Sequence, residues 1–235
     1  MATGGAIAVK STNPSNTGNV FNILGSTPPV AATNDLWFDS ANNTWYTYDA
    51  SGAWIQLTDN APWLASDSGL LLFNMYPESA AGSALAIAGT LYLLRINARA
   101  PITVSNVWFY VTAGGTGASS GSYVGLYSSS GTLLSGSSDI GSTLTSSGKQ
   151  GGALTTPQTL TAGSFYWCAF LVNLASTQPT LARSAVASAG LPNIGLTAAS
   201  YRMGVNGTGL TSLPSSVTPS SNSVTGANFY LTAVS

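Results

Sequence analysis

The residue types that carry most enzymatic chemistry are scarce in this sequence. Its 235 residues include no histidine, one cysteine (Cys168) and one glutamate (Glu78). Without histidine, the usual general base, the Ser-His-Asp and Cys-His arrangements and all His-containing zinc sites are excluded. One cysteine can form neither an intrachain disulfide nor a Cys-only metal site. The sequence therefore predicts a protein that is not an enzyme and that holds no catalytic residue, metal or other cofactor.

The remaining polar groups do not form a catalytic pattern. Glycoside hydrolysis needs two carboxyl groups about 5–10 Å apart, but the candidate aspartates fall in turn-forming sequence, and we interpret them as turn residues. These are Asp35, Asp39, Asp49, Asp59 and Asp67. Lys10 and Lys149 do not have the SxxK spacing of a serine–lysine dyad. The glycine-rich run 113–121 lacks the lysine of a phosphate-binding loop.

Aromatic side chains offer the best candidate contacts with a ligand. Residues 35–57 read DLWFDSANNTWYTYDASGAWIQL and contain three of the six tryptophans. An exposed tryptophan or tyrosine beside Asn or Asp can stack on a sugar ring, so the candidates for contact with a glycan or a partner are Trp45, Tyr46, Tyr48 and Trp54. We favour the alternative that these rings pack within a small sheet, because each buries about 150–250 Å² and so compensates for its small size.

The composition favours a β protein whose surface is covered in an assembly. Charged residues make up 6% of the chain and hydrophobic residues 44%, and the net charge is −1, whereas ordinary domains are about 25% charged. The six Lys and Arg residues are scattered and form no basic stripe, so we expect no binding to nucleic acid. The longest apolar run, Phe165–Val172, is far shorter than the ~20 residues of a membrane helix. We expect no membrane insertion.

Four segments follow from changes in composition along the chain. Residues 1–34, rich in glycine and small polar residues, predict an extended N-terminal arm that attaches to a neighbour. This arm lacks the apolar core of a signal peptide, so we expect synthesis in the cytoplasm of a host cell. Residues 35–58 predict a three-stranded β-meander, because short aromatic runs alternate with Asp/Asn/Ser/Gly turns. A linker at 59–67 then leads to a β-sandwich domain at 68–235.

The spacing of apolar runs in the last segment predicts an all-β antiparallel sandwich, of jelly-roll type, instead of alternating strands and helices. The expected strands lie near 70–75, 90–97, 101–112, 122–128, 131–135, 152–160, 164–173, 180–186, 200–205 and 227–234. Residues 191–209 and 211–223 contain proline and glycine and are expected to form loops.

One predicted strand is apolar on both faces. In Phe165–Val172 alternate side chains point to opposite sides, yet both sets are apolar, as they also are in Val107–Val111. Such a strand must be covered on both faces. One cover is the opposite sheet, and the other is a loop, the small domain or another subunit. We favour another subunit, so that Tyr166, Phe170 and Val172 become candidate interface residues.

Two segments resemble proteins of bacteriophage particles. The series of segments DLWFD, TWYTYD and AWIQL in residues 33–58 is similar to a small module of phage tail fibres and other virion appendages. The segments SNVWFYVTAGGTGASSGSYVGLYSSSGTLLS and TLTAGSFYWCAFLVN are similar to β-sandwich domains of phage minor tail and fibre proteins.

The resemblance implies a non-enzymatic structural protein of the virion, a tail fibre or minor tail protein that takes part in host attachment. It further implies a homotrimer, whose arm binds other virion proteins and whose sandwich contacts a glycan of the host surface. Because the sequence shows no coiled-coil or β-helical shaft, a capsid decoration or head-fibre protein is the alternative. A carbohydrate-binding module is a further alternative.

Overall fold

The computed structural model describes residues 7–10, 20–23, 36–39, 44–48, 50–56, 64–185, 190–225 and 227–235. The chain divides into two units, Met1–Leu64 and Ala65–Ser235. The linker expected at 59–67 lies mainly outside the described residues, and its end forms the 3₁₀ helix η1 (Ala65–Ser68). Of the expected arm, two strands are described.

The first unit contains one sheet, with strands in the order β1-β2-β3-β4-β5. The expected meander is present as three antiparallel strands, β3 (Leu36–Asp39), β4 (Thr44–Tyr48) and β5 (Trp54–Gln56). The predicted arm contributes a hairpin of β1 (Ile7–Lys10) and β2 (Val20–Ile23), and β2 pairs with β3 in parallel. The sheet therefore has five strands, two more than the aromatic pattern predicted.

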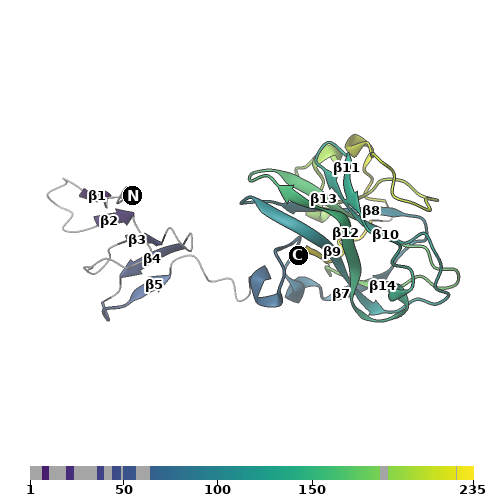
Figure 1. Cartoon of the computed structure of the whole chain (residues 1–235), viewed down its shortest axis with the longest axis horizontal. Coiled ribbons are helices and arrows are strands. Elements are labelled where there is room, and N and C mark those ends of the chain that lie inside the picture. The colour runs from purple at the N-terminus through teal and green to yellow at the C-terminus, as the bar shows by residue number, and fades with distance from the viewer. Residues whose placement is uncertain are drawn as a thin grey trace. The chain divides into compact units, whose positions relative to one another are not determined.

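The second unit consists of two antiparallel sheets, and Figure 1 labels most of their strands. One sheet has the order β11-β10-β13-β8-β15, and the other has β6-β16-β9-β14-β7 with β12 paired to β9. The strands are β6 (Leu72–Phe73), β7 (Gly82–Leu85), β8 (Leu91–Asn97), β9 (Ile102–Ala113), β10 (Tyr123–Ser128), β11 (Leu133–Gly136), β12 (Gly148–Leu160), β13 (Phe165–Leu171), β14 (Thr180–Arg183), β15 (Met203–Val205) and β16 (Thr232–Val234). The predicted all-β sandwich is confirmed.

Short 3₁₀ helices connect the strands of this unit. They are η1, η2 (Pro77–Ser79), η3 (Thr143–Thr145), η4 (Leu191–Asn193), η5 (Ala198–Ser200) and η6 (Pro219–Ser221). Each has only three or four residues. None of the described segments therefore supplies a helix that could build a coiled-coil shaft.

Aromatic rings form the centre of the core between the two sheets. Tyr92 of β8 stacks on Phe170 of β13, with ring centroids 4.8 Å apart, and Tyr230 meets both rings edge-on. Phe109 of β9 reaches the same cluster from the other sheet, 5.3 Å from Phe170. Offset and edge-on contacts of this kind stabilise a core by about 0.5–1.5 kcal/mol each beyond the burial of their area.

The opposite face of β13 is covered by a loop of the same chain. Trp167 and Leu171 are fully buried in a second apolar cluster, together with side chains of β8 and β10. Over this cluster pack Tyr201, Leu210, Leu213 and Val217. Hydrogen bonds hold the loop in place: the Leu91 N–H donates to the Gly207 carbonyl (3.1 Å), and the Tyr127 hydroxyl donates to the Pro214 carbonyl (2.7 Å).

These positions correct the expected subunit interface. Phe170 and Val172 are buried between the two sheets of a single chain, where they cannot contact another subunit. The Tyr166 ring packs partly buried against the same core, and its hydroxyl accepts a hydrogen bond from the Thr161 N–H (3.0 Å). The prediction that a subunit covers the second face of this strand is wrong, because the loop that ends near Val217 already does so.

We predict that Trp167→Ala lowers the free energy of unfolding by about 3–5 kcal/mol, the usual cost of deleting a large buried aromatic side chain. Trp167→Phe should cost much less, because the smaller ring keeps most of the contacts and the Trp167 Nε1 has no hydrogen-bond partner among the described residues. Urea unfolding followed by circular dichroism measures both.

Tyr110→Ala is the control, since the Tyr110 side chain is 46% exposed. Equal stability of the Trp167→Ala and Tyr110→Ala variants would contradict the sealing of this face by the loop.

Candidate functional site

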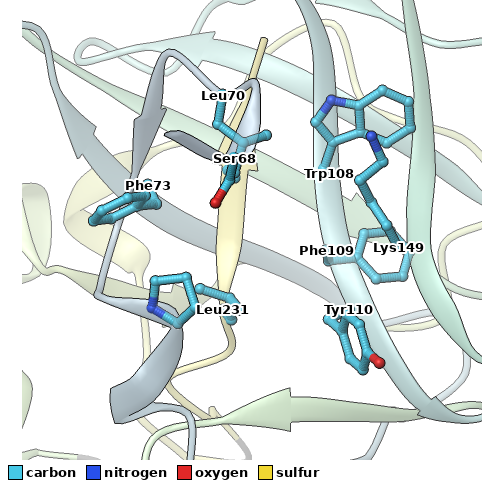
Figure 2. Close-up of a pocket in the computed structure, with 10 residues that line it drawn as sticks. Ser68, Leu70, Phe73, Trp108, Phe109, Tyr110, Lys149 and Leu231 are labelled. Carbon is cyan, nitrogen blue, oxygen red and sulfur yellow. The ribbon is translucent and has the colours of Figure 1, made fainter. Parts of the chain in front are cut away.

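An apolar groove lies on the outer face of the second sheet, where β9, β16 and β6 are neighbours (Figure 2). Strand pairing places Trp108 of β9 opposite Ala233 of β16, and Ala233 opposite Phe73 of β6. Because neighbouring strands are about 4.8 Å apart, the Trp108 and Phe73 backbones are roughly 10 Å apart, with only a methyl group between them. The short alanine side chain thus creates the hollow, whose volume is about 320 Å³.

Alternation along β9 explains why aromatic rings line this face. Val107, Phe109 and Val111 point into the core, so Trp108 and Tyr110 must point outward. Figure 2 shows these two rings on one side of the groove and Phe73 on the other. The remaining lining residues are Ser68, Leu70, Pro77, Phe109, Lys149, Leu231 and Ala233.

Two contacts hold the Trp108 ring in a fixed orientation. The Lys149 Nζ lies over the ring, 4.3 Å from its centroid, a cation–π contact that Figure 2 shows. In the plane of the ring, the indole Nε1–H donates a hydrogen bond to the Ser235 Oγ (2.8 Å). The wall formed by Trp108 is therefore preorganised for binding.

The adjacent strand β12 needs a glycine beside this tryptophan. Gly151 pairs with Trp108 and has a positive φ of 147°. A Cβ atom there would lie 2.1 Å from the Val107 carbonyl oxygen, so no other residue fits without a shift of the backbone. This close approach brings β12, with its Lys149, against the tryptophan side of the groove.

The chemistry of the groove is that of a binding surface. Apart from the Trp108 indole, whose N–H is bonded to Ser235, its polar side chains are the hydroxyls of Ser68 and Tyr110 and the ammonium of Lys149. None of its lining residues is a carboxylate or an imidazole that could activate a hydroxyl as a nucleophile. The groove can therefore take up an apolar group, with Lys149 at one wall for a neighbouring acceptor or negative charge.

Cys168 is not a usable nucleophile in the folded protein. Its side chain is buried in the core between the sheets, and this burial raises the pKa of the thiol to about 12. Because the thiolate is the reactive form, the thiol is inert near neutral pH. Cys168 therefore packs in the core as a small apolar residue.

The aromatic residues predicted from the sequence occupy both faces of the small sheet. Tyr46 stacks on Trp37 (4.8 Å), and Trp54 contacts both Trp37 and Tyr48 (5.7 and 5.1 Å). Trp45 does not join them: it points to the opposite face, where it packs on Phe38 (5.0 Å). Of the four candidate residues, three therefore form one cluster and Trp45 lies apart.

Trp37 is the centre of this cluster, although it was not among the candidate residues predicted from the sequence. It is only 4% exposed, it pairs directly with Tyr46, and its Nε1 has no hydrogen-bond partner among the described residues. The side chains of Tyr46, Tyr48 and Trp54 remain partly exposed around it. Packing accounts for Trp37, and the partly exposed rings keep a surface that a planar ligand could contact.

Comparison with known proteins gives no family assignment: no protein-family model matches the sequence, and no curated protein matches it significantly. In the part of the chain that the structure describes, no helix is long and apolar enough to cross a membrane. Across the same residues, no three metal-ligating side chains gather into a group.

We predict that the groove binds the apolar fluorophore 8-anilinonaphthalene-1-sulfonate and that Ala233→Leu weakens this binding at least fivefold. The larger side chain would fill the space between Trp108 and Phe73. Fluorescence titration of the folded protein gives the dissociation constants.

Ile194→Ser serves as control, because Ile194 is 80% exposed and does not line the groove. If this variant loses as much binding as Ala233→Leu, or if Ala233→Leu binds normally, the groove is not the site of binding.

Proposed function

We propose that this chain is a non-enzymatic structural protein of a bacteriophage virion, a tail fibre or minor tail protein that takes part in host attachment. The proposal is supported by two surfaces that the described residues form. They present an aromatic cluster on a small sheet and an apolar groove on a sandwich, with no nucleophile and base side by side at either. Both are recognition surfaces.

The sequence supports the phage assignment. The series of short aromatic segments in residues 33–58 and the strands around Trp108 and Trp167 resemble modules of tail fibres and minor tail proteins. A chain of 6% charged residues, with serine, threonine, asparagine and glycine as its polar remainder, also suits a protein that works as part of a particle. In this proposal the N-terminal unit binds other virion proteins and the sandwich faces outward.

A capsid decoration or head-fibre protein is the second candidate. It is favoured by the short 3₁₀ helices, since the described residues contain no helix of the length a fibre shaft uses. A carbohydrate-binding module is a further alternative, and the partly exposed rings of Tyr46, Tyr48 and Trp54 favour it.

We also propose that the protein is a homotrimer, with an interface outside the sealed core of the sandwich. An exposed sheet edge supports this: β7 is the last strand of its sheet, and Leu85 at its end and Ile87 two residues later are 54% and 53% exposed. Unpaired edge strands with apolar side chains favour pairing with another chain.

Sedimentation velocity at micromolar concentration should show a species of three times the chain mass, and Leu85→Lys should shift it toward monomer. Thr112→Lys adds the same charge at an exposed position of a central strand and should not. A monomer at all concentrations would contradict the proposed trimer.

Gold-labelled antibodies against the full chain, applied to purified virions and viewed by electron microscopy, test the location. The tail proposal predicts label at the tail, with no label on virions treated with antibodies that were first absorbed with the protein. Label over the head would favour the decoration protein, and particles without any label would contradict a virion role.

A further inference from the structure

Three of the six positively charged residues lie together in the sandwich unit. Arg95 lies on β8, Arg99 in the turn between β8 and β9, and Arg202 directly before β15. Arg99 and Arg202 line a cleft of about 350 Å³. Arg95 donates from its Nε to the Oδ1 of Asn97, which also lines the cleft (3.0 Å). No acidic side chain is among the lining residues.

Aromatic rings and carbonyls hold two of these guanidinium groups. Arg95 lies over the Phe165 ring, 4.2 Å from its centroid, and its Nη1 donates to the Ser200 carbonyl (2.9 Å). Arg202 lies over the Phe229 ring at 4.8 Å. Since arginine loses little further freedom once its planar group is stacked, both are prepared for hydrogen bonding to an anion.

Among the described residues, no carboxylate lines this cleft to balance its positive charges. Burial lowers the pKa of Arg95, and the nearby charge of Arg202 lowers it further. A bound anion would relieve this repulsion and accept charge-assisted hydrogen bonds, which are about twice as strong as neutral ones. In a chain with so few charges, three clustered arginines favour a carboxylate, sulfate or phosphate group as the ligand.

The floor of the cleft suits a sugar ring. The Tyr76 side chain is 46% exposed, and its ring is supported by Phe73, with centroids 5.2 Å apart. The Asn97 side chain is exposed, and because its Oδ1 already accepts from Arg95, its Nδ2 can donate to a hydroxyl group. An exposed supported aromatic ring, an amide donor and guanidinium groups together can contact the C–H face, the hydroxyls and the carboxylate of an acidic sugar.

We propose that this cleft binds a saccharide that carries a carboxylate group, with Arg99 and Arg202 at the carboxylate and the Tyr76 ring against the sugar. The cleft volume lies in the range of small-ligand sites, about 300–1,000 Å³. The inference deepens the proposed role in host attachment, on which the choice of a saccharide rests. The arginine cluster itself is independent of that role.

Isothermal titration of the full chain with an oligogalacturonate and with its methyl ester tests the proposal, because esterification removes the negative charge of each carboxylate and adds only a methyl group. The acid should bind, and the ester should bind at least tenfold more weakly. Arg99→Gln should lower the affinity for the acid at least fivefold, and so should Tyr76→Ala. Inorganic sulfate, as a third probe, should bind more weakly than the oligosaccharide.

Arg183→Gln is the matched control, since it removes one positive charge outside the cleft and should leave the affinity unchanged. Circular dichroism verifies that each variant is folded. Asn97→Ala, at an exposed position, provides a second test should Tyr76→Ala fail to fold, and should weaken binding at least threefold.

Four outcomes would overturn the inference: no binding of the acid, equal binding of the acid and its ester, equal losses in Arg99→Gln and Arg183→Gln, or sulfate binding as tight as that of the saccharide with no effect of Tyr76→Ala. The last result would mean a site for a bare anion. Because these titrations use purified protein, their failure is distinguishable from failure of the virion assignment, which particle labelling measures.

Discussion

The structure depends on the need to cover β13 on both faces. Phe170 and its neighbours on one face fill the core between the sheets, and Trp167 and Leu171 on the other form a second cluster. Leaving the second face in water would expose several large apolar side chains, each of which gains about 1.5–3 kcal/mol from burial. The irregular segment after β15 supplies the cover, which explains why so much chain without regular structure is held in place by hydrogen bonds to the strands.

β9 also has apolar residues on both faces, but none of the described loops seals its outer face. The side chains of Val107, Phe109 and Val111 point into the core, as that of Phe170 does in β13. The side chains of Trp108 and Tyr110 point outward, where their neighbours cover them only in part. Ala233 on the neighbouring strand is too small to fill the space, so a groove remains. One strand with two apolar faces therefore stabilises the sandwich, and the other leaves an apolar groove on the outer face of its sheet.

Much of the fold was predictable because strand signals are local. Aromatic and β-branched runs between glycine and serine turns predicted the meander and most strands of the sandwich. The strand β7 was missed because its sequence, GSAL, has neither type of residue. The cover of β13 could not be predicted, since Leu210, Leu213 and Val217 are isolated apolar residues in a loop-like segment and show no period. The groove and the arginine cleft combine residues far apart in the chain, which only strand pairing brings together.

Hydrogen exchange of the β13 amides measures whether a single chain seals both faces of this strand. The measurement is made across a range of protein concentrations, with sedimentation used to monitor association. If the loop is the cover, the amides from Trp167 to Leu171 are protected to the same degree when the protein is monomeric as when it is associated. Protection that develops only as copies associate would mean that another copy, and not the loop, covers this face of β13.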